Sequence, residues 1–83
     1  MIRLTLYGRP GCHLCDDMLA ALAPHQASLG FALDEVDVDT DPALAARYGV
    51  LIPVLAWGSR EICHYRLDAE ALLKTLRNPG EDG

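Results

Sequence analysis

Residues 2–15 read IRLTLYGRPGCHLC, and the hydrophobic period changes within this stretch. Apolar and polar side chains alternate over residues 2–7, as in a strand with one buried face. Gly8-Arg9-Pro10-Gly11 interrupts the alternation, and apolar residues recur at helical spacing from Cys12 onward. The stretch therefore predicts a strand, a tight turn and a helix whose first turn carries two cysteines.

The helix after this turn is expected to have one apolar face. That face is formed by residues at helical spacing, namely Leu14, Cys15, Met18, Leu19, Leu22 and Leu29. Pro24 is expected to kink or end the helix, and Gly30 is a stop signal in any case. A second strand is predicted from Phe31 to Val38, where apolar residues again dominate.

A short helix is predicted over residues 42–48. Pro42 suits the first helical position and Gly49 suits a helix end. One of three polar residues, Asp39, Thr40 or Asp41, can cap it by accepting a hydrogen bond from the first turn.

The last third of the chain predicts a hairpin and a helix. Strands are expected over residues 54–57 and 60–65, joined by the two-residue turn Gly58-Ser59. Asp68 is expected to cap a helix over residues 69–76. We expect one domain over residues 1–78 and a polar tail over residues 79–83.

The order of elements is therefore β-α-β-α-β-β-α, which defines an α/β fold. The first two strands are joined by a helical crossover and should be parallel. The last two form a hairpin, so the prediction is a mixed four-stranded sheet covered by helices.

Composition and charge exclude several classes of function. The chain has 83 residues, of which 51% are hydrophobic and 23% charged, as in an ordinary globular protein. Seven basic residues against twelve acidic ones give a net charge of −5, so we expect no nucleic-acid partner. No stretch is long and apolar enough to span a membrane, and no signal-peptide pattern is present. We therefore expect a cytoplasmic protein without a membrane partner. We also expect a monomer.

The pair Cys12 and Cys15 is the main chemical signal. Two thiols three positions apart at a helix start are within reach of one disulfide, and helix N-terminal N–H groups favour a thiolate at Cys12. Cys12 is thus expected to attack a disulfide, and Cys15 to resolve the mixed disulfide that forms. Arg9 and a protonated His13 would lower the pKa of the Cys12 thiol further, whereas Asp16 and Asp17 would oppose this.

Two other interpretations of the cysteines remain open. Cys12 and Cys15 could be half of a zinc site completed by Cys63 and His64, although adjacent ligands suit one ion poorly. They could also be core residues without chemistry. Cys63 itself is interpreted as a small core residue, with a second redox thiol or a dimer bridge as alternatives.

Ile52-Pro53-Val54 is the second signal. Proline is tolerated at the first position of a strand because it need not donate a ladder hydrogen bond there. The functional interpretation is a cis proline whose loop leaves a backbone edge free for a substrate chain.

Three segments together resemble glutaredoxin-like proteins of the thioredoxin fold: residues 7–15, 36–42 and 48–54. The resemblance covers about residues 2 to 77. It implies a sheet in the order 2-1-3-4, with the third strand antiparallel to both neighbours. It also implies that Cys12 is the exposed nucleophile, that Ile52-Pro53 is cis beside it, and that Arg9 meets a glutathione carboxylate.

The chain also departs from the glutaredoxin pattern. His13-Leu14 replaces the usual Pro-Tyr between the cysteines, and Leu51-Ile52 precedes the proline in place of Thr-Val. Where glutaredoxins carry a glycine pair that holds glutathione, this chain has Cys63-His64, so close backbone approach is lost.

The sequence thus predicts a thiol–disulfide oxidoreductase of cell redox homeostasis that needs no bound cofactor. Cys12 and Cys15 would be catalytic, and Arg9, His13, Ile52 and Pro53 would form the substrate site. The expected partners are a disulfide-containing protein or glutathione, the latter as a co-substrate, and a reductase for recycling. The alternatives are a metal or iron–sulfur cluster carrier that uses Cys12, and a redox-inert interaction domain of the same fold.

Overall fold

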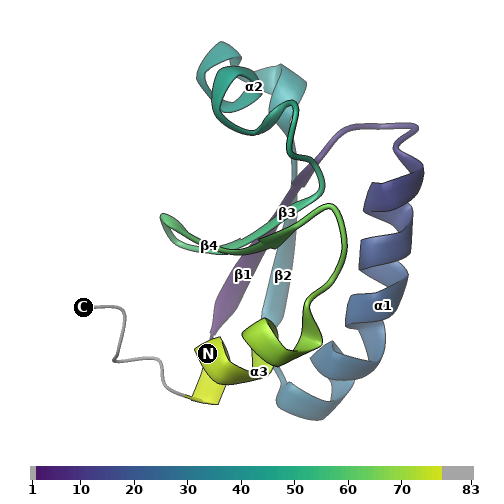
Figure 1. The fold of residues 1–83 in the computed structure, drawn as a ribbon, viewed down its shortest axis with the longest axis vertical. Helices are drawn as coiled ribbons and strands as arrows, with labels where there is room; N and C mark the ends of the chain where they lie inside the picture. Colours follow the sequence, from purple (N-terminus) through teal and green to yellow (C-terminus); the bar gives the residue numbers. More distant parts are fainter. Residues whose placement is uncertain (1, 78–83) are drawn as a thin grey trace.

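Four strands and three α-helices make up residues 2–77, the part of the chain that the computed structural model describes (Figure 1). The elements are β1 (Arg3–Gly8), α1 (His13–Leu29), β2 (Ala32–Asp37), the 3-10 helix η1 (Val38–Thr40), α2 (Pro42–Tyr48), β3 (Val54–Trp57), β4 (Arg60–His64) and α3 (Ala69–Arg77). The predicted element order is confirmed, with η1 as an addition. The tail expected at residues 79–83 lies outside the described residues.

The strands form one mixed sheet in the order β2-β1-β3-β4. β1 pairs parallel with β2, from Arg3 opposite Ala32 to Gly8 opposite Asp37. β3 is antiparallel to both β1 and β4. This topology confirms the predicted order 2-1-3-4. It also places β1 inside the sheet, so that its C-terminal end, where α1 begins, is flanked by strands on both sides.

The main core lies where α1 and α3 pack against the sheet. Its buried members are Leu4, Leu6, Met18, Leu22, Phe31, Leu55, Cys63 and Leu72. Burial of such side chains contributes roughly 1.5–3 kcal/mol each to folding, so this cluster supplies most of the driving force. On the predicted apolar face of α1, Leu14 and Leu29 lie outside this core and are 45% and 42% exposed. Both lie near the ends of α1.

Helix α1 continues through Pro24 to Leu29, so an end at Pro24 is wrong, and a kink there stays a prediction. Pro24 is exposed, while Met18 and Leu22 before it are buried and hold the helix against the sheet. After the proline the helix ends as predicted at Gly30, which has φ 74° and donates its N–H to the Gln26 carbonyl at 2.9 Å. None of the helices within residues 2–77 has the length and hydrophobicity to cross a membrane.

The predicted second strand is too long by one residue at each end, because Phe31 precedes β2 and Val38 begins η1. The Asp37 carboxylate accepts a hydrogen bond from the Asp39 N–H at 2.9 Å and so caps η1. The side chain then ends strand pairing by offering the backbone a local partner. The predicted returning strand, residues 60–65, is also too long by one residue, because β4 ends at His64.

A second, smaller cluster fastens α2 to the sheet through Val38, Tyr48 and Val54. The rings of Tyr48 and Tyr7 stack with centroids 4.3 Å apart. Burial, and then the neighbouring Tyr48, raises the pKa of Tyr7. Because Tyr7 is in β1 and Tyr48 ends α2, this contact joins the end of α2 to the sheet.

We expect Asp41→Ala to lower the free energy of unfolding by about 1 kcal/mol. Asp41 is the N-cap of α2, and its Oδ1 accepts a hydrogen bond from the Ala43 N–H at 2.9 Å. Asp41→Asn keeps a capping oxygen and is the matched control. Urea denaturation followed by circular dichroism measures both variants, and equal losses in the two would contradict the capping role.

Candidate active site

Cys12 and Cys15 form a disulfide at the N-terminus of α1, with their Cα atoms 5.2 Å apart. Cys12 is the N-cap residue, and its Sγ accepts a hydrogen bond from the Cys15 N–H at 3.1 Å. Its carbonyl accepts the first helical hydrogen bond, from the Asp16 N–H at 3.1 Å. Both cysteines are half-buried. Once the disulfide is reduced, the same N–H and the positive end of the helix favour a thiolate at Cys12.

Gly8 makes room for the disulfide at the end of β1. A Cβ on this residue would lie 2.8 Å from the Sγ of Cys15 and 3.4 Å from its Cβ. No side chain fits there, so the first turn of α1 can approach the sheet only because residue 8 is glycine. Gly11, with φ 78°, completes the turn into the helix.

The loop before β3 reaches the same end of the sheet. The Ile52–Pro53 peptide bond is cis, and Pro53 is fully buried. The antiparallel register pairs Tyr7 with Val54, so one step further along it places Pro53 next to Gly8. Gly8 in turn contacts Cys15, and the topology therefore brings the proline and the cysteine pair together.

Tyr65 fastens this loop to the end of β4. Its backbone N–H donates to the Pro53 carbonyl at 2.9 Å, and its hydroxyl donates to the Val50 carbonyl at 3.1 Å. The residue has φ 67°, a left-handed conformation that is uncommon for a bulky side chain. The His64 ring packs edge-on against the Tyr65 ring, with the two centroids 4.6 Å apart. Its Nδ1 lies 2.7 Å from Oε2 of Glu61. These contacts occupy the segment where glutaredoxins would carry their glycine pair.

Arg9 lies beside the turn and is engaged with Asp39. Its Nε and Nη2 donate to the two oxygens of that carboxylate, each at 3.1 Å. Its Nη2 would be 3.5 Å from a Cβ on Gly49, so the guanidinium also lies at the negative end of α2. His13 is exposed as the first residue of α1. The contacts of Arg9, His13, Ile52 and Pro53 with a substrate stay predictions.

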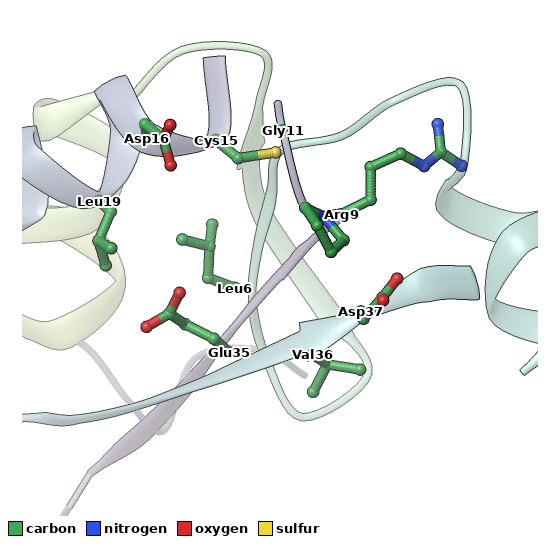
Figure 2. A pocket seen from close by; sticks show the side chains of 11 residues that line it. Leu6, Arg9, Gly11, Cys15, Asp16, Leu19, Glu35, Val36 and Asp37 are labelled. Atoms are coloured by element: carbon green, nitrogen blue, oxygen red, sulfur yellow. The ribbon is translucent and has the colours of Figure 1, made fainter. Parts of the chain in front are cut away.

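A pocket of about 290 Å³ opens beside the disulfide, between the start of α1 and the ends of β1 and β2 (Figure 2). Its lining consists of Leu6, Gly8, Arg9, Pro10, Gly11, Cys15, Asp16, Leu19, Glu35, Val36 and Asp37. Cys15 thus contributes to a pocket wall from α1, while two acidic residues come from β2.

Cys63 is free and lies in the main core, as its first interpretation predicted. Burial raises the pKa of its thiol. Cys63 lies opposite Leu55 in the β3–β4 register. The side chain of its neighbour His64 instead contacts the carboxylate of Glu61. Within residues 2–77, no three side chains of His, Cys, Asp or Glu are grouped so that they could hold a metal ion. The zinc site with Cys63 and His64 therefore gains no support.

Sequence reasoning did not identify Gly8, Asp39, Glu35 or Tyr65 as parts of this site. Gly8 could have been found from its position, because it is the last strand residue before the turn to the cysteines. Glu35 could have been found by alternation, because it lies on the same face of β2 as the core-facing Leu33. Nothing local in the sequence indicated the pairing of Arg9 with Asp39 or the conformation of Tyr65.

Comparison with known proteins gives a family match and several similar structures. The family model of the glutaredoxin-like domain (DUF836) matches residues 3–77. The Mycobacterium tuberculosis protein Rv0508 is 31% identical over 75 residues, which are 84% of this chain and 77% of that protein. The solution structure of protein Ne2328 from Nitrosomonas europaea is 36% identical, covers 88% of each chain and has a TM-score of 0.80.

A more distant structure bears on the fold alone. Thioredoxin 1 from Thermosipho africanus is 16% identical, with a TM-score of 0.62 over 94% of this chain and 93% of that chain. The arrangement of sheet and helices is therefore the thioredoxin fold.

We expect Gly8→Ala to lower the free energy of unfolding by about 1–3 kcal/mol, because the added methyl group collides with the Cys15 sulfur. The matched comparison makes the same substitution in a Cys15→Ala background, where the sulfur is absent. There most of the loss should disappear. Urea denaturation of the four proteins gives the coupling between the two sites, and an equal loss in both backgrounds would contradict the contact.

We also expect Cys63 of the reduced, folded protein to react with iodoacetamide at least about tenfold more slowly than Cys12 near neutral pH. Its pKa is raised, so its thiol stays protonated at a pH where an ordinary thiol begins to ionise. Peptide mapping after timed alkylation measures the ratio. Unfolding in denaturant should abolish the difference, and equal rates in the folded protein would refute the expectation.

Proposed function

The chain belongs to the glutaredoxin-like family, and on that basis we propose that it exchanges its Cys12–Cys15 pair with the disulfide of another molecule. The main support is the Cys12–Cys15 disulfide at the N-terminus of α1, where Cys12 is the N-cap residue of the helix. A helix N-terminus favours the thiolate that such an exchange requires. The protein would therefore be a thiol–disulfide oxidoreductase.

The proposed reaction uses two thiols and has two steps. The Cys12 thiolate attacks one sulfur of the substrate disulfide, forms a mixed disulfide and releases the other substrate sulfur as a thiolate. The Cys15 thiolate then attacks the Cys12 sulfur, closes the Cys12–Cys15 disulfide and releases the second substrate thiolate. Two electrons pass from the protein to the substrate, and solvent protonates the released thiolates at a pH below their pKa.

The surroundings of the pair support this division of roles. The Sγ of Cys15 lies against Gly8, whereas Cys12 precedes the helix and follows the exposed turn at Gly11. Pro53 would shape the substrate site, because the β1–β3 register places it beside Gly8. Arg9 and His13 would contact the substrate from the turn.

The partners and setting of this reaction are part of the proposal. The substrate would be a disulfide of a protein or a mixed disulfide with glutathione, and glutathione would act as co-substrate without a resident cofactor. A separate reductase would return the Cys12–Cys15 disulfide to the dithiol. In the cytoplasm, a monomer of this kind would contribute to redox homeostasis.

Equilibration in glutathione redox buffers tests the function. After alkylation of free thiols, intact-mass measurement should show two alkylation sites lost together as the buffer becomes oxidising. Cys12→Ser and Cys15→Ser should each abolish this paired loss, and Cys63→Ser is the matched control that should retain it. A glutathione adduct on Cys12 in the Cys15→Ser variant would identify glutathione as a reaction partner. Three thiols that stay alkylatable in every buffer would refute the function.

A further inference from the structure

We propose that the pocket beside Cys15 receives a positively charged group of the substrate. The preferred substrates would then be disulfides that carry an ammonium or guanidinium group close to the reacting sulfur. This inference rests on the proposed thiol–disulfide exchange and adds to it the class of disulfide. Gly11, which precedes Cys12, and Cys15 both line the pocket. The groups next to a disulfide that Cys12 attacks therefore come within reach of the pocket.

The acidic residues reach the pocket for reasons of strand and helix geometry. Alternate residues of β2 face α1, and Leu33 at the start of this row packs on the main core. Glu35 and Asp37 continue the same row toward the end of the strand and line the pocket. Asp16, in the first turn of α1, completes the set from the other side. Figure 2 shows the carboxylates of Asp16 and Glu35 on opposite sides of the Leu6 side chain.

No free cation among the lining residues offsets this charge. Arg9 is the one basic residue among them, and it is held by both oxygens of Asp39. In Figure 2 its guanidinium points away from Asp16 and Glu35. With Asp39 included, four carboxylates stand against one guanidinium, a local charge of −3. A cation near the disulfide is therefore attracted and an anion repelled.

The shape of the pocket fits an organic cation. Leu6 and Leu19 give it an apolar part, against which the aliphatic stem of a lysine or arginine side chain can pack. In residues 2–77 no three acidic, His or Cys side chains gather closely enough for a metal ion. Separated carboxylates around an apolar surface instead suit a group that extends from a longer substrate. In the exchange itself, the cation only binds, and the two-electron transfer between thiols and disulfide proceeds as above.

Single-turnover reduction of small disulfides tests this selectivity without a recycling reductase. Reduced protein is mixed with cystamine, which is cationic, with neutral 2-hydroxyethyl disulfide, or with anionic 3,3′-dithiodipropionate. Quenching with iodoacetamide and weighing the intact chain gives each rate, and the rates with dithiothreitol correct for intrinsic reactivity. We expect the corrected rate with cystamine to exceed that with dithiodipropionate at least about tenfold at low salt. The ratio should fall as salt is raised from about 0.01 M to about 1 M, where screening reduces the Debye length from about 30 Å to about 3 Å.

Charge-neutralising variants locate the effect. Glu35→Gln should reduce the cystamine-to-dithiodipropionate ratio by about threefold to fivefold, the size of one charge interaction at short range in water. Glu70→Gln removes the same charge from α3, which lies at the far end of α1 from the disulfide, and should leave the ratio unchanged (Figure 1). Two peptide disulfides that differ only in Lys or Glu next to the cysteine then separate a protein substrate from a free small amine.

The outcomes distinguish this inference from the proposed function. If none of the disulfides oxidises the Cys12–Cys15 pair, the exchange reaction itself is refuted. If all react but the corrected ratio is near one, or if Glu35→Gln and Glu70→Gln change it equally, the function stands and the cation preference is overturned. Because the salt series uses the unaltered protein, it decides the matter even if Glu35→Gln fails to fold.

Discussion

The contact between the Cys15 sulfur and the backbone of Gly8 is the constraint around which the other parts of the site are arranged. It brings the first turn of α1 onto the end of β1, and the chain must then reverse within the short segment that contains Gly11. It also leaves Cys12 at the N-cap, outside the helix but within reach of its N–H groups. On the other side of β1, the pairing with β3 ends at Tyr7 and Val54, and Pro53 directly precedes Val54. A larger residue at position 8 would move the first turn of α1, Cys12 and Pro53 away from the end of β1 at the same time.

Local signals predicted the elements well, because they depend on neighbours in the sequence. Asp41 caps α2 and Gly30 ends α1, as their types and positions indicated. One error arises where tertiary contacts override local preference. Pro24 does not end α1, since the buried Met18 and Leu22 keep that helix on the sheet and Gly30 completes it.

The site was predictable in its cysteines and much less so in its surroundings. The spacing of Cys12 and Cys15 is local and indicated their chemistry directly. The pairing of Arg9 with Asp39, 30 residues away, depends on the topology of the whole sheet. The hydrogen bonds of Tyr65 likewise join β4 to a loop that precedes β3. Such long-range pairings hold a site in one geometry before a ligand arrives, which reduces the freedom lost on binding.

Strand β2 lies at one edge of the sheet, because it stands at the end of the strand order. An outermost strand presents unpaired backbone groups that could join another copy of the chain and start aggregation. Here Asp34, Glu35 and Asp37 make up half of the strand, so two such edges brought together would repel each other. The negative charge of β2 therefore also opposes aggregation at high protein concentration. A chain with a neutral β2 would be more prone to form intermolecular sheets.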